Sequence, residues 1–378
     1  MIREKIIPRT HWQEQIENLG FNFHTLNGIP YWDESACYQF SAKQINILEA
    51  TTKELYSLCL KAVQHVIDNN LFHLFYIPDE FIPLIKDSWE KDYPSIYGRF
   101  DFSWNGNLSE PPKLFEFNAD TPTSLFEASI VQWQWQKELH PDDDQFNSIH
   151  ERLIGQWKKL KKKLPDETLY FSCLDEFPED YVTVSYIQDC ATEAGIETEY
   201  ISLSEIGWNG NIFTDNFENR IHSIFKLYPW EWLVNEDFGV HLPECDTIWI
   251  EPVWKMLLSN KAILAVLWDL FPHHPNLLEC YFDEPKSLKS YAIKPFLSRE
   301  GANIKIVEEG KLLEETSGDY GEEGFVFQQL CKLPNFDGNY AVIGSWVIGG
   351  NPAGIGIRES SSLVTNNTSR FLPHYFKK

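Results

Sequence analysis

Four polar side chains with the chemistry of a metal and phosphate site recur at every second position of two short segments. Arg99 and Asp101 alternate with aromatic residues in the first segment, and Glu116 and Asn118 do so in the second. This period of two predicts β-strands with one polar and one apolar face. Carboxylate and amide oxygens are ligands that Mg²⁺ takes alongside waters and phosphate oxygens, and a guanidinium group suits the same phosphates.

The sequence between the two segments predicts that they pair. Asn-Gly at 105–106 and Pro-Pro at 111–112 indicate a hairpin or a short meander. Phe115 and Phe117 would then share the apolar face, and the four polar side chains would converge on the other. The alternative is an ordinary half-solvated sheet, which alternation by itself favours over a metal site.

Length and charge limit the class of protein. The chain has 378 residues, more than a typical single core of about 100–200 residues holds, so we expect two or three subdomains. A net charge of −24 argues against nucleic acid or an anionic membrane as the main partner. An acidic surface would attract an amine substrate, although solubility is the simpler explanation.

The N-terminal residues carry charges where a signal peptide needs an apolar run, and no apolar stretch has the length of a membrane span. We therefore expect a cytoplasmic protein. The seven cysteines are scattered, odd in number and without a C-x-x-C pair, which argues against a disulfide framework or a structural zinc. They are interpreted as reduced residues, mostly in the core.

Periodicity predicts the elements that position the two segments. A helix follows the N-cap Ser41 and continues to about residue 69, and a shorter helix over 81–89 leads into the hairpin. Helices are also expected over 124–139 and from the acidic residues 142–144 to about 164. Beyond a boundary at 165–166, a strand at 168–174, a helix at 179–194 and strands at 197–203, 224–227 and 247–250 indicate a β-α-β unit.

Two lysines stand at the ends of elements in the C-terminal part. Lys261 begins an apolar helix that ends near 271, and Lys294 lies on a strand that leads into a small-residue loop at 298–303. That loop contains Gly301 and is a natural lid. An apolar strand is expected over 325–331 and a hairpin over 340–358. There is no P-loop, zinc-protease motif or nucleophile elbow, so any ATP would be held in another way.

Six ordered blocks resemble the glutathionylspermidine synthase family of ATP-grasp ligases. The blocks are 97–101 (Tyr-Gly-Arg-Phe-Asp), 115–121 (Phe-Glu-Phe-Asn-Ala-Asp-Thr), 260–264, 292–295, 328–330, and 357–358 followed by 362–364. The resemblance covers nearly the whole chain and implies an α+β or α/β fold of the ATP-grasp type. Within a catalytic region over 1–378 we expect a β-α-β substrate subdomain at 166–250 and a lid subdomain at 260–327.

The resemblance also implies roles for the polar residues of the two segments. Asp101, Glu116 and Asn118 would bind two Mg²⁺ ions, with Glu116 bridging them. Arg99 and Arg358 would be the catalytic groups, because positive charge stabilises a transferring phosphoryl group.

Thr121 would contact the substrate, and the remaining implied contacts are to ATP. The residues expected to bind ATP are Arg99, Asp101, Lys261, Lys294, Gln328, Gln329, Leu330, Cys331, Leu363, Val364 and Thr365. Without the resemblance, Lys261 would be interpreted as an exposed residue, Arg358 as a surface ion pair and Gln328 as part of a sheet edge.

The implied activity is an ATP- and Mg²⁺-dependent acid–amine ligation through an acyl phosphate, with glutathione or a peptide-like acid and an amine as substrates. Two departures from the family limit this. The chain begins at the synthetase part, so we expect no amidase activity. No acid follows Glu359, where spermidine-using members have one, and the residues available are Asn366, Asn367, Thr368 and Arg370, which argues against spermidine.

Two other functions stay open. The first is a non-catalytic ATP-binding scaffold on the same fold. The second is an ATP-dependent kinase that releases a phosphorylated product without ligation. Retention of both carboxylates together with the cations favours the ligase, since an idle site need not keep them.

Overall fold

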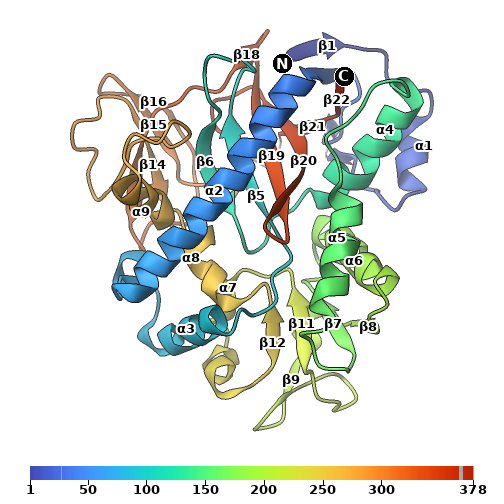
Figure 1. Ribbon diagram of the computed structural model, residues 1–378, viewed down its shortest axis with the longest axis vertical. Coiled ribbons are helices and arrows are strands. Elements are labelled where there is room, and N and C mark those ends of the chain that lie inside the picture. The colour runs from blue at the N-terminus through green and yellow to red at the C-terminus, as the bar shows by residue number, and fades with distance from the viewer. Residues whose placement is uncertain (27, 366–368, 378) are drawn as a thin grey trace.

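A central antiparallel sheet carries the predicted hairpin. The computed structural model describes residues 1–26, 28–365 and 369–377, and Figure 1 shows the sheet in the middle of the molecule. Its strand order is β21-β20-β19-β5-β6, with β18 added on β19. The strands are β5 (Tyr97–Ser103), β6 (Lys113–Asn118), β18 (Asn335–Phe336), β19 (Asn339–Ile348), β20 (Asn351–Ser360) and β21 (Arg370–Leu372).

The hairpin forms as the alternation predicts, but with a bulge. Asp101 pairs with Glu116, whereas Phe102 pairs with Leu114, so Phe115 is an extra residue in β6. Phe117 is buried in the core. Phe115 instead lines a cavity beside Glu116. The prediction that Phe115 shares the apolar face is therefore wrong, because the bulge shifts the alternation by one residue.

A long helix crosses the central sheet (Figure 1). This helix, α2 (Ala42–Asp68), has Ser41 as its N-cap, as predicted, and the side chains of Ser41 and Gln44 form a capping box. Its apolar side is buried at Leu48 and Leu55. The Thr52 hydroxyl lies 2.7 Å from that of Ser345 on β19, which fixes the helix against the sheet. The shorter helix α3 (Ile82–Glu90) leads into β5.

The helix predicted over 124–139 is irregular. A π-helical turn, η3 (Glu127–Val131), precedes α4 (Gln132–Leu139), and Ser124 has a left-handed backbone with φ of 65°. The following helix, α5 (Ile149–Leu160), ends before residue 164. The π turn packs on the central sheet, since a Cβ on Gly356 would lie 3.3 Å from Ala128.

The predicted β-α-β unit forms a four-stranded parallel sheet with the order β12-β11-β7-β8. It lies below the central sheet, with α5 and α6 over one side (Figure 1). Its elements are β7 (Leu169–Ser172), α6 (Pro178–Glu193), β8 (Thr198–Tyr200), β11 (Ser223–Lys226), α7 (Trp230–Leu233) and β12 (Ile248–Ile250).

A third, antiparallel sheet has the order β13-β17-β14-β15-β16 and lies on the other side of the molecule, next to α9 (Figure 1). It contains the strands predicted to carry Lys294 and Gln328. Its elements are α8 (Met256–Ser259), α9 (Ala262–Leu270), β13 (Cys280–Phe282), β14 (Tyr291–Pro295), β15 (Lys305–Glu308), β16 (Lys311–Glu315) and β17 (Phe325–Gln329).

Both ends of the chain meet in a small sheet of β1 (Ile2–Lys5), β4 (Ala36–Ser41) and β22 (His374–Lys377). The remaining elements are short. They are α1 (Trp12–Glu17), β2 (Thr25–Leu26), β3 (Ile29–Pro30), β9 (Gly207–Trp208), β10 (Phe213–Thr214), and the 3-10 helices η1 (Phe72–Phe75), η2 (Asp79–Phe81), η4 (Leu203–Glu205), η5 (Gly239–Glu244) and η6 (Val253–Lys255).

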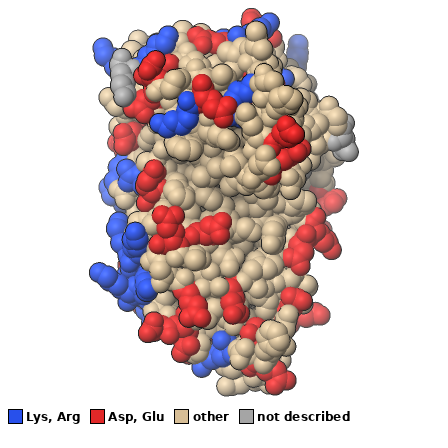
Figure 2. Space-filling view, turned by 90° about the vertical axis from the view of Figure 1, so that its right-hand side faces the viewer, with Lys and Arg blue, Asp and Glu red and all other residues tan. Residues whose placement is uncertain are grey.

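The cysteines agree with the prediction of reduced residues that lie mostly in the core. All seven lie among the described residues and are free, and five of them are buried. Acidic side chains are dispersed over the face shown in Figure 2, and basic ones gather mainly along one edge of it. Within the described part of the chain, every helix is too short or too polar to cross a membrane.

Candidate active site

The four polar residues of the hairpin lie together on one face of the central sheet. Arg99 donates to both carboxylate oxygens of Asp101, over 2.8 Å from Nε and 3.1 Å from Nη2. The amide Nδ2 of Asn118 lies 3.3 Å from Glu116 Oε1 and 3.4 Å from Asp101 Oδ2. Register brings them into contact, since Arg99 pairs with Asn118 and Asp101 with Glu116.

Two lysines from distant elements reach the same place. Lys261 Nζ lies 3.2 Å from Glu116 Oε2 and donates to the carbonyl of Ser298. Lys294 Nζ donates to Gln328 Oε1 over 2.7 Å and to the carbonyl of Phe115 over 3.2 Å. Three cationic groups and two carboxylates therefore meet at one end of the hairpin.

This concentration of charge changes the acidity of its members. Burial alone would raise the pKa of Glu116, but the charges of Lys261 and Lys294 outweigh it and lower the pKa to about 2. Burial lowers the pKa of Lys294 to about 8, and the charge of Lys261 adds to this while Glu116 opposes it. The carboxylate is held ionised, and Lys294 gives up its proton more easily than an ordinary lysine.

A cavity opens beside these charges, between the central and the third sheet, and together with its solvent-filled mouth it contains about 750 Å³ of space free of atoms. Small-molecule sites are typically concave and open to solvent on one side in this way. Of the residues predicted from the sequence, those lining it are Asp101, Glu116, Lys294, Gln328, Gln329, Leu330, Cys331, Leu363, Val364 and Thr365. Ala292, Ile304 and Ile306 make one side of it apolar, so it is charged at one end and apolar at the other.

Arg358 lies outside the residues that line the cavity. It pairs with Val342, and its guanidinium carbon is 5.4 Å from the ring of Phe371. Asp101 pairs with Gly344, two residues from Val342, so Arg358 and Asp101 share a face of the sheet. A Cβ on Gly344 would lie 2.9 Å from Arg99 Cδ, so glycine leaves room for that arginine.

Thr121 also lies outside the residues that line the cavity. Its side chain contacts Arg299, to which the sequence analysis assigned no role. Arg299, in the loop at 298–303, donates to Thr121 Oγ1 over 2.8 Å and forms an ion pair with Glu231. The guanidinium also stacks 5.5 Å from the ring of Trp232. The sequence did offer one signal, an arginine two residues before Gly301 in a small-residue loop. It could not identify the partners of Arg299, because Glu231 and Thr121 are 68 and 178 residues away.

Four residues of the C-terminal tail were considered in place of the acid that spermidine-using family members have. Three of them lie outside the described residues, namely Asn366, Asn367 and Thr368. Arg370 is engaged by ion pairs with Asp33 at 3.2 Å and Glu359 at 3.1 Å. Its side chain is therefore committed to the acids beside β20 and β4.

The donor set of the hairpin fits Mg²⁺ by its chemistry. Within the described residues no group of three or more His, Cys, Asp and Glu side chains could hold a metal ion, so an amide must complete any set here. Asp101, Glu116 and Asn118 offer hard oxygens in mutual contact. Turning the amide of Asn118 over would direct its oxygen, in place of Nδ2, to the carboxylates.

Comparison with known proteins gives the family. A family model described as glutathionylspermidine synthase preATP-grasp matches residues 3–377. The chain belongs to the glutathionylspermidine synthase family. Its relatives include proteins named as an acid–amine ligase, a trypanothione synthetase and a glutathionylspermidine synthetase/amidase. The family model and these relatives confirm the resemblance that the six sequence blocks indicated, and they show a ligase that forms carbon–nitrogen bonds.

Relatives differ in how much of their length the chain matches. It is 42% identical over 380 residues to a Haemophilus influenzae protein provisionally named an acid–amine ligase, covering 96% of both chains. It is 29% identical to the trypanothione synthetase of Crithidia fasciculata, of which it covers 53%. It is also 29% identical to the bifunctional glutathionylspermidine synthetase/amidase of Escherichia coli, of which it covers 60%.

A solved structure supports the fold class. The apo form of a glutathione synthetase-like effector from Globodera pallida matches with a TM-score of 0.55 at 10% identity, over 90% of this chain and 89% of that one. At this identity the likeness concerns the fold alone. The fold is therefore a mixed α/β fold of the glutathione synthetase-like kind, and the narrower assignment to the ATP-grasp type stays a prediction.

Proposed function

We propose that this protein is an ATP- and Mg²⁺-dependent acid–amine ligase that works through an acyl phosphate. The observation that carries the proposal is the cavity with an apolar side and a charged end. Asp101, Glu116 and Lys294 line the charged end, and behind this lining Arg99 contacts Asp101 and Lys261 contacts Glu116. Such an arrangement suits a nucleotide, whose base is flat and whose phosphates are anionic.

ATP enters this cavity with its adenine on the apolar side. The end of β17 and the following residues, Gln328 to Cys331, border the base from one side, and Leu363 to Thr365 border it from another. The triphosphate then lies toward Lys261 and Lys294. Both lysines are buried, so their charges are weakly screened by water and attract the phosphates strongly.

Asp101, Glu116 and Asn118 would hold two Mg²⁺ ions, which neutralise the β- and γ-phosphate oxygens when bound. The carboxylate of the acid substrate attacks the γ-phosphorus, and the bond between that phosphorus and the ADP oxygen breaks. The amine then attacks the carbonyl carbon of the acyl phosphate, loses a proton and expels phosphate. Arg99 and Arg358 stabilise the charge of the transferring group, and the protein supplies no nucleophile.

The substrates bind between the hairpin and the parallel sheet over 166–250. Thr121 contacts the acid substrate. The lid over 260–327 closes over the substrates, and the ion pair between Arg299 and Glu231 holds it in place. Closure excludes water, which would otherwise hydrolyse the acyl phosphate. Because two relatives are named for glutathionylspermidine and trypanothione synthesis, glutathione or a similar peptide acid is the first acid to test.

The test is release of phosphate from ATP in the presence of Mg²⁺, with glutathione and short peptides tested against a panel of amines. We expect phosphate and an amide product only when acid and amine are both present. Formation of ADP and a stable phosphorylated acid with the acid alone, without release of phosphate, would replace the ligase by a kinase. Binding of ATP without turnover of any acid and amine would leave the ATP-binding scaffold. Failure of the protein to bind ATP would overturn both the ligase and that scaffold.

A further inference from the structure

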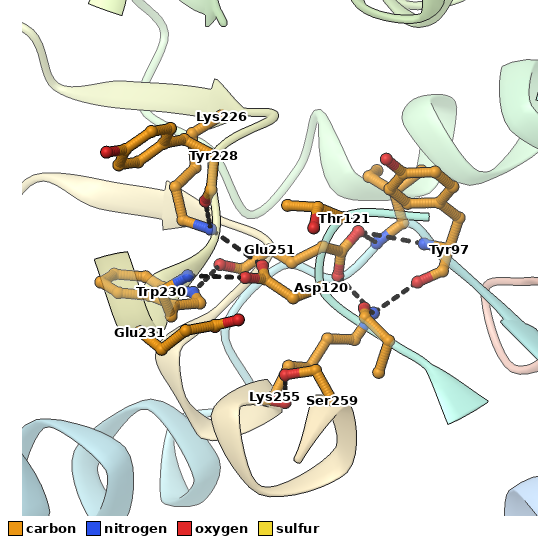
Figure 3. Close-up of polar contacts among 12 residues, drawn as sticks. Tyr97, Asp120, Thr121, Lys226, Tyr228, Trp230, Glu231, Glu251, Lys255 and Ser259 are labelled. Atoms are coloured by element: carbon orange, nitrogen blue, oxygen red, sulfur yellow. Dashed lines mark hydrogen bonds and ion pairs between the residues drawn. The ribbon is translucent and has the colours of Figure 1, made fainter. Parts of the chain in front are cut away.

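Asp120 follows the proposed metal ligand Asn118 by two residues, and its carboxylate is completely buried. Both oxygens have a partner. Lys226 Nζ donates to Oδ1 over 2.8 Å, and the backbone N–H of Trp230 donates to Oδ2 over 2.9 Å. Asp120 thereby connects the end of β6 to β11 and α7 of the parallel sheet, as Figure 3 shows.

Lys226 is equally enclosed. Its side chain is 0% exposed, its ammonium also donates to the carbonyl of Tyr228 over 2.8 Å, and it lies 4.6 Å from the centre of the Trp230 ring. Burial lowers the pKa of Lys226, and the charge of Asp120 opposes that shift. The two side chains therefore have no contact left to offer to a substrate.

A second buried pair holds the backbone beside them (Figure 3). Lys255 Nζ lies 2.6 Å from Glu251 Oε2 and donates to the carbonyls of Tyr97 and Ala119, over 2.5 Å and 2.9 Å. Glu251 Oε1 in turn accepts the backbone N–H of Tyr97 over 3.0 Å. The start of β5 and the residue before Asp120 are thus fixed by the same network.

Such pairs add little net stability, because desolvation of two charges offsets most of their attraction. What a buried pair does provide is one defined geometry. We propose that Asp120 and Lys226 are positioning residues, which hold residues 118–121 so that Asn118 faces Asp101 and Glu116 while Thr121 meets Arg299. This inference rests on the proposed function, in which Asn118 is a ligand of Mg²⁺.

The test uses Asp120→Asn, which keeps the shape of the side chain and removes its charge. Binding of a non-hydrolysable ATP analogue is measured by calorimetry over a range of Mg²⁺ concentrations, so the readout is independent of turnover. We expect the Mg²⁺ concentration for half-maximal binding to rise by about tenfold, the lower end of the effect of losing a residue that orients a metal ligand.

The matched control is Glu34→Gln. Glu34 and Arg9 form another buried pair, with the atoms 2.6 Å apart and side chains 0% and 3% exposed, and neither lines the cavity. We expect this variant to lose stability without any change in the Mg²⁺ dependence. A change as large as that of Asp120→Asn would make the effect a general one of lost stability and would overturn the inference.

A double variant, Asp120→Asn with Lys226→Met, protects the test against misfolding, because it leaves no buried charge alone. We expect it to melt closer to the wild type than Lys226→Met and still to need about tenfold more Mg²⁺. Wild-type Mg²⁺ dependence in a folded variant, or failure of both Asp120 variants to fold, would overturn the inference. If the wild type itself bound no nucleotide, the proposed function would fail instead.

Discussion

Two lysine–carboxylate pairs differ in their surroundings, although their carboxylates, Glu116 and Asp120, are only four residues apart in the sequence. Lys261 lies 3.2 Å from Glu116, whose side chain is 27% exposed and lines the cavity. Lys226 lies 2.8 Å from Asp120, and both side chains are 0% exposed. The first pair is open to a ligand, and the second has every polar atom engaged by protein. The same kind of ion pair thus borders the proposed ligand site in one place and has the positioning role that we propose in the other.

The difference has an energetic consequence. Glu116 lines the cavity, so water can solvate its carboxylate when Lys261 is removed. Lys261 keeps the carbonyl of Ser298 as a hydrogen-bond partner when Glu116 is removed. A charge left alone in the closed pair stays in the interior without a partner, which is costly. Substitutions in the open pair should therefore change activity more than stability, and substitutions in the closed pair should change stability more.

The largest effect is expected at the open pair. Glu116→Ala removes the carboxylate that would bridge two metal ions, so we expect kcat to fall by about a thousandfold, beyond the 10–100-fold loss typical of a residue behind a metal ligand. The melting temperature should stay close to that of the wild type, because the side chain borders the cavity. Phosphate release and thermal melting measure the two. A variant with full activity would remove Glu116 from the metal site.

The closed pair gives the next effect. Lys226→Met leaves Asp120 charged and buried, so the free energy of unfolding should fall by about 3–5 kcal/mol. Urea denaturation followed by circular dichroism measures the loss. A loss below about 1 kcal/mol, the range of an exposed pair, would show that the two pairs do not differ in the way that their burial indicates.

A third carboxyl group, that of Glu127, tests how burial affects stability where the hydrogen-bond donor is a tyrosine hydroxyl instead of a lysine or arginine. Burial, together with the charge of Glu179, raises the pKa of Glu127 to about 8, while Tyr31 donates to Oε1 over 2.7 Å. A raised pKa means that the folded state favours the protonated form, so its stabilisation is complete below about pH 4.5 and is lost as the pH rises toward 8.

Glu127→Gln should therefore gain stability relative to the wild type as the pH rises from 5 to 8, by about 3–4 kcal/mol, because each pKa unit corresponds to about 1.4 kcal/mol. Urea unfolding at several pH values measures this change. If the difference between the two proteins were the same at every pH, Glu127 would be charged in the folded protein throughout that range.

The smallest effect is expected at Gly344, which lies against the side chain of Arg99. The new methyl group of Gly344→Ala would lie 2.9 Å from Arg99 Cδ and displace the guanidinium, so we expect kcat to fall by about tenfold, as misplaced catalytic groups do. KM for ATP should change less than kcat, because the residues that line the cavity are unaltered and Arg99 is not among them. Gly155→Ala in α5 is the control, because no atom lies within 4 Å of the new methyl group. Equal kinetics in both variants would remove Arg99 from the reaction.

Local pattern predicted the parts of this account that depend on neighbouring residues. The alternation in residues 97–118 placed Arg99, Asp101, Glu116 and Asn118 on one face, and the strand register confirms it. The cap at Ser41 could be predicted because it depends only on the next few residues.

Features that depend on distant residues could not be predicted in this way. The bulge at Phe115 adds one residue to one strand, and alternation carries no sign of it. Lys226 is 106 residues from Asp120, and Arg299 is 178 residues from Thr121, so neither contact leaves a local pattern. Lys261 and Lys294 were singled out through the family resemblance, because each alone is an ordinary lysine at the end of an element.

A crystal structure with Mn²⁺ and a non-hydrolysable ATP analogue tests the central claim most directly. The account predicts anomalous signal about 2.1–2.3 Å from oxygens of Asp101 and Glu116, with the γ-phosphate between the metal and the ammonium groups of Lys261 and Lys294. A nucleotide bound elsewhere, or metal signal away from both carboxylates, would contradict it.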